Sequence, residues 1–175
     1  MIPSRPSYAV AALLLAVLPG CHRDPAPAQQ VAGPDPLIAR GEYLVRTSGC
    51  NDCHTSGYPE RQGEVPVEQW LTGSPLGYHG PWGTTYATNL RLRMQELDEP
   101  QWLQYSGNLR TRPLMPDFAV RAMSEDDRRA IYRFVRSLGA AGEPAPPALA
   151  PGVTPPEPYL ALVAGSPPPP GPTGN

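Results

Sequence analysis

The sequence predicts a small all-α domain with about three to four helices, on three observations. Apolar residues recur at helical spacing in several segments that are bounded by capping residues. No segment shows a convincing strand-like alternation of apolar and polar residues. Residues 36–140, which carry these segments, have the length of one small domain. The formal net charge of −2 gives no indication of nucleic-acid binding.

The first two expected helices lie at residues 37–48 and 100–105. The first has one broad apolar face that includes Gly41 and Tyr43, and it ends at a glycine. The second is shorter, with Asp98 as its candidate N-cap and Gly107 as its stop signal.

The third expected helix begins after Ser124 and ends before Gly139. Asp127 stands three residues after Ser124, close to the pattern of a capping box. A single apolar stripe is formed by Ile131, Phe134, Val135 and Leu138. We expect this stripe to face the core of the domain.

The middle of the domain, residues 56–97, is rich in glycine, proline and aromatic residues and has little periodicity. About forty irregular residues in one small domain indicate that the core is not self-sufficient. Three short helices also bury too little apolar surface to hold such a segment in place. A large, rigid, apolar group at the centre of the domain would resolve both difficulties.

Both ends of the chain differ from this domain in composition. Residues 1–20 have the short apolar core of a secretory signal peptide and end in a sequence that resembles a bacterial lipobox. We expect export to the periplasm and acylation of Cys21, which would anchor the protein to a membrane; the alternative is ordinary cleavage that leaves a free thiol. Residues 21–35 read as a flexible tether. Residues 141–175 read as a Pro-rich extended or disordered tail, in which residues 159–163 either dock onto the domain or stay exposed.

The stretch CNDCH contains two cysteines, Cys50 and Cys53, and a histidine, His54. A redox dithiol would follow a strand, whereas this motif follows a helix. A zinc site needs a fourth ligand, from His79 or from Cys21 and His22 beyond the tether. Attachment of c-type haem uses all three residues, because the two thiols bind one edge of the porphyrin and the imidazole ligates the iron. The haem would also supply the missing core, so we favour this interpretation.

A methionine further along the chain is the expected second iron ligand. Met115 is flanked by two prolines that hold the chain out of a helix, and a rigid loop suits a soft thioether ligand. Met94 and Met123 are expected to fill the core. His79 is the alternative ligand to Met115.

Over residues 36–140 the chain resembles class I cytochromes c. The shared features are the helix that leads into the CNDCH motif, the Met115-Pro116 loop and the final amphipathic helix. GPWGTTYATN at residues 80–89 is similar to a stretch in the cytochrome c modules of bacterial membrane alcohol and sugar dehydrogenases, which often carry three haems where this chain has one motif. The resemblance implies a small class I cytochrome c fold around one covalently bound haem c, with long irregular loops.

The carboxylates of a buried haem, its propionates, require hydrogen-bond donors. Candidate donors in and after residues 80–89 are Trp82, Tyr86, Asn89, Arg91 and Arg93. We expect at least one of them to bind a propionate.

Iron ligated by both His54 and Met115 has no open position, which favours electron transfer over catalysis or binding of a small-molecule substrate. The expected function is that of a one-electron carrier between protein partners, a donor dehydrogenase and an acceptor of the respiratory chain. Two other classes stay open: a haem enzyme or gas sensor in which Met115 detaches, and a non-haem, lipid-anchored interaction module.

Overall fold

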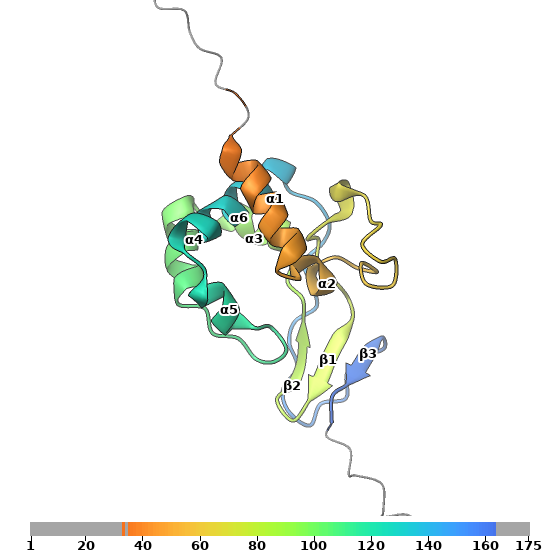
Figure 1. Ribbon diagram of the computed structural model, residues 1–175. Helices are drawn as coiled ribbons and strands as arrows, with labels where there is room; N and C mark the ends of the chain where they lie inside the picture. The colour runs from red at the N-terminus through yellow and green to blue at the C-terminus, as the bar shows by residue number, and fades with distance from the viewer. Residues whose placement is uncertain (1–32, 34, 164–175) are drawn as a thin grey trace, which may run out of the picture. The chain divides into compact units, whose positions relative to one another are not determined.

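The computed structural model describes residue 33 and residues 35–163. The expected signal peptide (residues 1–20), Cys21 and residues 164–175 lie outside this range, so their predicted roles stay predictions. The elements in chain order are α1 (Pro36–Thr47), α2 (Cys50–His54), a 3₁₀ turn (Val67–Gln69), β1 (Gly77–Gly80), β2 (Gly83–Tyr86), α3 (Leu90–Glu96), α4 (Glu99–Gly107), α5 (Asp117–Ala122), α6 (Glu125–Leu138) and β3 (Tyr159–Ala161) (Figure 1). None of the helices in the described range combines the length and apolarity needed to span a bilayer.

The three helices expected from the sequence are present as α1, α4 and α6. Asp35 caps α1, and Ser124 caps α6 by accepting a hydrogen bond from the Asp127 amide. Asp98 and Gln101 form a complete capping box at the start of α4. The capping residues Asp98 and Ser124, which the sequence indicated, therefore begin α4 and α6, whereas the Asp35 cap of α1 was not predicted.

The pair α1 and α6 forms the most extensive contact between helices in the described chain. Gly41 lies at their crossing, where an added Cβ atom would stand 2.0 Å from the Ala130 carbonyl oxygen. The helices can approach this closely only because residue 41 has no side chain. Tyr43, which was expected on the buried face of α1, is instead exposed, with Arg40 stacked over its ring.

The middle segment, residues 56–97, contributes side chains to the same hydrophobic core as α1 and α6. Trp70 and Leu71 are buried there, and the Trp70 indole donates a hydrogen bond to the Val65 carbonyl oxygen at 2.8 Å. Met94 of α3 completes the same cluster. The expectation of a long irregular middle is therefore wrong in part, because this segment contains α3, two strands and its own core residues.

A three-stranded sheet in the order β2-β1-β3 makes the all-α prediction incomplete. Strands β1 and β2 form an antiparallel hairpin whose last pair is Gly80 and Gly83, with Pro81 and Trp82 in the turn. Strand β3 pairs with β1 in parallel register. The hairpin is short and its third strand comes from far along the chain, so periodicity could not reveal it.

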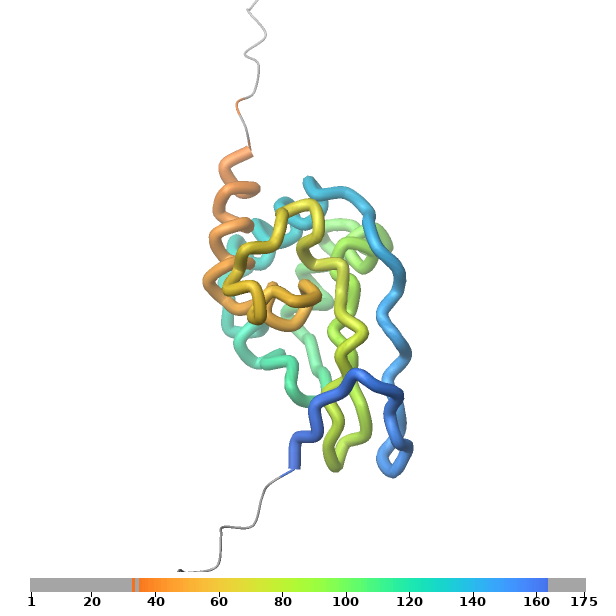
Figure 2. The backbone as a smooth tube through the Cα atoms, turned by 90° about the vertical axis from the view of Figure 1, so that its right-hand side faces the viewer, coloured from red at the N-terminus to blue at the C-terminus, as the bar shows by residue number. Residues whose placement is uncertain are grey.

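Residues 141–163, which we name the C-terminal strap, run as mostly extended chain from the end of α6 to the hairpin (Figure 2). The Asn89 side chain donates to the Ala141 carbonyl oxygen at 2.8 Å near the start of the strap. Further along, Leu149 and Thr84 exchange two main-chain hydrogen bonds of 2.9 and 3.1 Å. Of the two possibilities for residues 159–163, the structure shows the docked one, since β3 lies within them.

Candidate functional site

The CNDCH motif forms the short helix α2, which follows α1 after a sharp turn at Gly49 with a φ of +69°. Cys50 and Cys53 are both free thiols and both half-buried. The spacing of three residues puts them about one helical turn apart. Cys50 also packs against the edge of the hydrophobic core. The motif therefore lies at the edge of the hydrophobic core.

His54 is held rigidly by contacts of both its ring and its main chain. Only 8% of the residue is exposed, and its Nδ1 donates to the Thr88 carbonyl oxygen at 2.7 Å. The His54 carbonyl oxygen accepts a hydrogen bond from the Gly73 amide at 2.8 Å. With the proton on Nδ1, the lone pair is left on Nε2, and no hydrogen bond within the described chain uses Nε2. This is the arrangement of a metal-ligating histidine whose other nitrogen is fixed by a carbonyl.

A buried polar link fixes α2 to the core behind His54. Thr55 Oγ1 donates to Asn51 Oδ1 at 2.7 Å and accepts a hydrogen bond from the Leu71 amide at 2.8 Å. The Nδ2 group of Asn51 is buried without a hydrogen-bond partner in the described chain. The Thr55 hydroxyl group thus ties the C-terminal end of α2 to Leu71 in the core.

The protonation states of the motif suit ligation better than thiol redox chemistry. Burial raises the pKa of Cys50 to about 11, which is the opposite of the lowered pKa that activates a redox thiol. Burial also lowers the pKa of His54, against the opposing effect of its hydrogen bond to Thr88. Burial is likewise the main cause that raises the pKa of Tyr78, with the neighbouring Cys53 thiol adding to it. At neutral pH the Cys50 thiol is thus protonated and the His54 imidazole is neutral.

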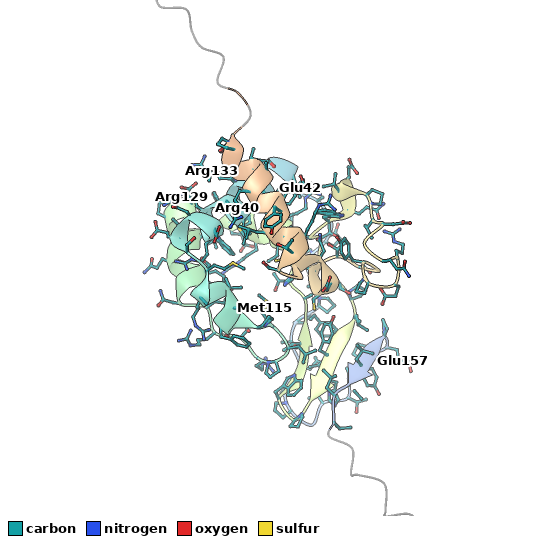
Figure 3. All side chains as sticks on the ribbon, viewed as in Figure 1. Arg40, Glu42, Met115, Arg129, Arg133 and Glu157 are labelled. Carbon is teal, nitrogen blue, oxygen red and sulfur yellow. The ribbon has the colours of Figure 1, made fainter. Side chains whose placement is uncertain are left out.

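Met115 lies in the loop between α4 and α5, residues 108–116, which we name the Met115 loop. The Asp117 amide donates to the Met115 carbonyl oxygen at 2.9 Å, and the Thr111 amide donates to Asp117 Oδ2 at 2.6 Å, so the loop is closed at its base. Figure 3 shows Met115 between α5 and the hairpin. Leu114 and Phe118, close to Met115 in sequence, are 47% and 67% exposed, although large apolar side chains usually find a partner.

The structure distinguishes the three methionines of the domain. Met94 is 0% exposed and belongs to the core cluster, and Met123 packs against that cluster. Met115 is half-buried and is not part of the cluster. Core packing therefore accounts for two of the three residues and leaves Met115 without such a role.

The hairpin carries a polar group without a partner. Trp82 Nε1 is buried and has no hydrogen bond within the described residues. A buried donor of this kind is costly unless a further group accepts its proton. Tyr86, at the end of β2, is half-buried, and its hydroxyl group makes no hydrogen bond to the described residues. Both residues remain candidates for contact with haem propionates.

Asn89 has a structural role that the sequence did not reveal. Its Oδ1 atom accepts a hydrogen bond from the Leu92 amide and so caps α3. Its Nδ2 atom donates to the carbonyl oxygens of Ala141 and Glu143 in the C-terminal strap. The side-chain amide is thus engaged by the protein itself.

Arg91 is also engaged by the protein, although it was expected as a propionate donor. Its buried guanidinium donates to the main-chain carbonyl oxygens of Glu68, Leu138 and Gly139. It thereby binds the free carbonyl groups at the end of α6. Arg93 pairs with Glu96 at 2.6 Å and stacks on Tyr105. These contacts explain both arginines without a ligand.

His79, the alternative iron ligand, lies in β1. Its Nδ1 is 2.9 Å from Thr84 Oγ1, and its ring meets the edge of Tyr159 in β3. The ring is therefore tied into the sheet. Within the described residues, no three His, Cys, Asp or Glu side chains are clustered as ligands of a small metal ion would be.

The residues of this region fit a covalently attached haem. The two free thiols, the imidazole with an unused Nε2, the thioether outside the core and the unpaired Trp82 donor match the attachment, ligation and carboxylate groups that a haem presents. The decisive carbonyl of Thr88 could not be found from the sequence, because a main-chain group carries no residue-specific signal.

The chain is similar to a known protein over most of its length. It is 33% identical over 129 residues to the gluconate 2-dehydrogenase cytochrome c subunit of Pantoea cypripedii, across 64% of this chain and 28% of the relative. The chain thus spans less than a third of that relative's length. No protein-family model and no solved structure matches the chain. The similarity supports a cytochrome c-like family and a role as an electron carrier.

Proposed function

We propose that the chain is a one-electron carrier with a single haem c bound covalently through Cys50 and Cys53. The observation that carries this proposal is the geometry of α2, where two free thiols precede a buried histidine whose Nδ1 donates to the Thr88 carbonyl oxygen at 2.7 Å. The similarity to a cytochrome c subunit supports the same cofactor independently.

The bound haem would supply an iron centre that exchanges one electron between Fe(III) and Fe(II). In this proposal Cys50 and Cys53 keep the haem attached through two thioether bonds, and His54 ligates the iron through Nε2. Met115 provides the second ligand, a neutral soft thioether that raises the reduction potential by favouring Fe(II). Trp82 Nε1 donates to a propionate and thereby acquires the partner that it lacks within the protein.

The rigidity of the ligating segments suits rapid electron exchange. His54 is fixed through its ring and its carbonyl group, and the Met115 loop is closed by Asp117. Because neither segment needs to move when the charge of the iron changes, little reorganisation accompanies the transfer. If His54 and Met115 both held the iron, the chain would exchange electrons with protein partners and would not act on a small-molecule substrate.

We infer that the donor is a dehydrogenase and that electrons pass on to the respiratory chain. The matched relative is, by its name, a cytochrome c subunit of gluconate 2-dehydrogenase, which supports a dehydrogenase partner. Export to the periplasm and acylation of Cys21 would hold the carrier at a membrane. If so, Cys21→Ser should move the protein from the membrane fraction to the soluble fraction with an unchanged spectrum, whereas a wild-type protein that is already soluble would overturn the anchor.

Haem attachment is tested by expressing the chain with haem-attachment machinery and recording alkaline pyridine haemochrome spectra. Cys50→Ala and Cys53→Ala should each leave a single thioether bond and shift the spectrum. Cys21→Ser is the matched control, because it removes a thiol outside the motif and should leave the spectrum unchanged. An unshifted spectrum in both motif variants, or a colourless wild-type protein, would refute the assignment.

A further inference from the structure

Arg112 joins three segments that are distant in sequence, three residues before Met115. Its Nη1 atom donates to the Trp82 carbonyl oxygen at 3.1 Å and to the Leu149 carbonyl oxygen at 3.0 Å. Trp82 lies in the turn of the hairpin, and Leu149 lies in the C-terminal strap. A single side-chain nitrogen thus ties the Met115 loop to both.

A second hydrogen bond connects the same two regions. Thr85 Oγ1 in β2 donates to the Pro113 carbonyl oxygen at 2.7 Å. On the other side of Met115, Asp117 closes the base of the loop, because its Oδ2 atom accepts a hydrogen bond from the Thr111 amide. Met115 therefore lies between two anchored points, one on the hairpin and one on α5.

The hairpin and the strap form a firm support for Arg112. Gly83 in β2 approaches the strap so closely that an added Cβ atom would lie 2.2 Å from the Leu149 carbonyl oxygen. Two main-chain hydrogen bonds between Thr84 and Leu149 fix this contact. The carbonyl groups that Arg112 binds are consequently held in place by the sheet and not by the loop.

The charge of Arg112 has no other evident use in the described chain. It forms no ion pair there, whereas Arg121, on the neighbouring helix α5, pairs with Asp117 at 2.5 Å. Arg110, two residues away on the same loop, donates only to the adjacent Leu109 carbonyl oxygen at 2.8 Å. Arg112 and Arg110 thus carry the same charge on the same loop but differ in whether they hold it to the sheet.

We propose that Arg112 is a positioning residue that fixes the Met115 thioether with respect to the hairpin and the strap. The inference rests on the proposed function, in which Met115 ligates the iron. Without Arg112, the loop keeps its closed base but loses its guanidinium link to the sheet. Met115 would then leave the iron more often. The strap, whose Leu149 carbonyl oxygen binds Arg112, would thus affect a ligand that lies far from it in sequence.

The test compares Arg112→Gln with Arg110→Gln in the haem-loaded full chain. Both variants remove one positive charge from the Met115 loop, so a general electrostatic effect on the iron should appear in both. Carbon monoxide is the probe, because it binds ferrous iron only when Met115 has left. We expect Arg112→Gln to bind it about tenfold faster and to weaken the sulfur-to-iron absorption band, with Arg110→Gln close to wild type.

Two further variants keep the test decisive. Arg112→Lys should recover part of the wild-type behaviour, since an ammonium group can also donate to two carbonyl groups. Thr85→Val should accelerate carbon monoxide binding in the same direction, by a smaller factor, and replaces Arg112→Gln if that variant does not fold. The inference would be overturned if Arg112→Gln and Arg110→Gln bound carbon monoxide at the same rate while Met115→Ala still exposed the iron. If Arg112→Gln does not fold, a wild-type rate in Thr85→Val would overturn it instead. If Met115→Ala itself is unchanged, the ligand assignment fails and the inference fails with it.

Discussion

Two regions of the molecule differ in how many of their side chains find a partner within the protein. The first surrounds α1 and α6, and the second comprises α2, the hairpin and the Met115 loop. In the first, apolar side chains are buried against one another, and the Trp70 indole donates to Val65. In the second, Trp82 Nε1 is buried without a partner, two thiols are free, and Met115 lies outside the core. The indole group of Trp70 thus has a hydrogen-bond acceptor within the described residues, whereas that of Trp82 has none.

This difference indicates that the two regions have different requirements. The α1–α6 region is largely completed by its own apolar contacts, and among the described residues Arg128 Nε is its one buried polar atom without a hydrogen-bond partner. Substitutions there should therefore change the free energy of unfolding and leave the reduction potential alone. The region around α2 has unused donors and ligands, so substitutions there should change the potential and the spectrum. Two measurements on one set of variants therefore separate the regions.

The largest effect is expected from Gly41→Ala at the crossing of α1 and α6. The new Cβ atom would meet the Ala130 carbonyl oxygen at 2.0 Å, and a main-chain atom cannot turn aside as a side chain can. We expect a loss of more than about 3 kcal/mol in the free energy of unfolding, measured by chemical denaturation. Gly107→Ala is the control, because its Cβ would meet only the flexible Arg128 side chain, at 3.4 Å. Similar stability of the two variants would contradict the close crossing.

The two tryptophans provide the sharpest version of the comparison. Trp70→Phe leaves the buried Val65 carbonyl oxygen without its donor and should cost about 1–3 kcal/mol, with no change in reduction potential. Trp82→Phe removes a donor that no described residue uses, so the hydrogen bond that is lost should be one to a propionate. The reduction potential should then fall by less than about 59 mV. A changed potential in Trp70→Phe, or none in Trp82→Phe, would show that the division between regions is wrong.

The sequence predicted α4 and α6 well because the capping signals at their N-termini are local. The capping box of Asp98 and Gln101 and the cap at Ser124 are readable within four residues. Helix α3 was missed although Asn89 caps it locally, because it has only seven residues and Arg91 in it contacts the distant end of α6. Helix α5 has six residues and no side-chain cap, so it leaves almost no local pattern.

The sheet was missed for a related physical reason. Strands β1 and β2 have four residues each, and β3 reaches β1 only after the chain has passed through α6 and the strap. The Gly-rich turn around Pro81 was a usable hint of a hairpin. At the site, Cys50, Cys53 and His54 were readable as a motif, whereas the support from Thr88 was not.

The smallest effect is expected from the ion pair of Arg40 and Asp127, which joins α1 to α6 at 2.9 Å. Its hydrogen bond with Arg40 lowers the pKa of Asp127, so the pair stabilises the fold above the pKa of the unfolded carboxyl group. Asp127→Asn should cost about 0.5 kcal/mol at neutral pH, since the side chains of Arg40 and Asp127 are 50% and 27% exposed and solvent screens the pair. The difference from wild type should shrink as the pH falls below about 4. A difference that does not depend on pH would exclude the ion pair as its cause.

The central claim is that Met115 ligates the iron. The most direct test measures the reduction potential and ferrous carbon monoxide binding of Met115→Ala, with Met94→Ala as the control. Removing a neutral soft ligand should lower the potential, abolish the sulfur-to-iron absorption band and let carbon monoxide bind readily. Met94→Ala should cost about 2–5 kcal/mol in stability and change none of these properties, because Met94 is a fully buried core residue. A wild-type spectrum and potential in Met115→Ala, together with their loss in His79→Ala, would contradict the account and make His79 the ligand.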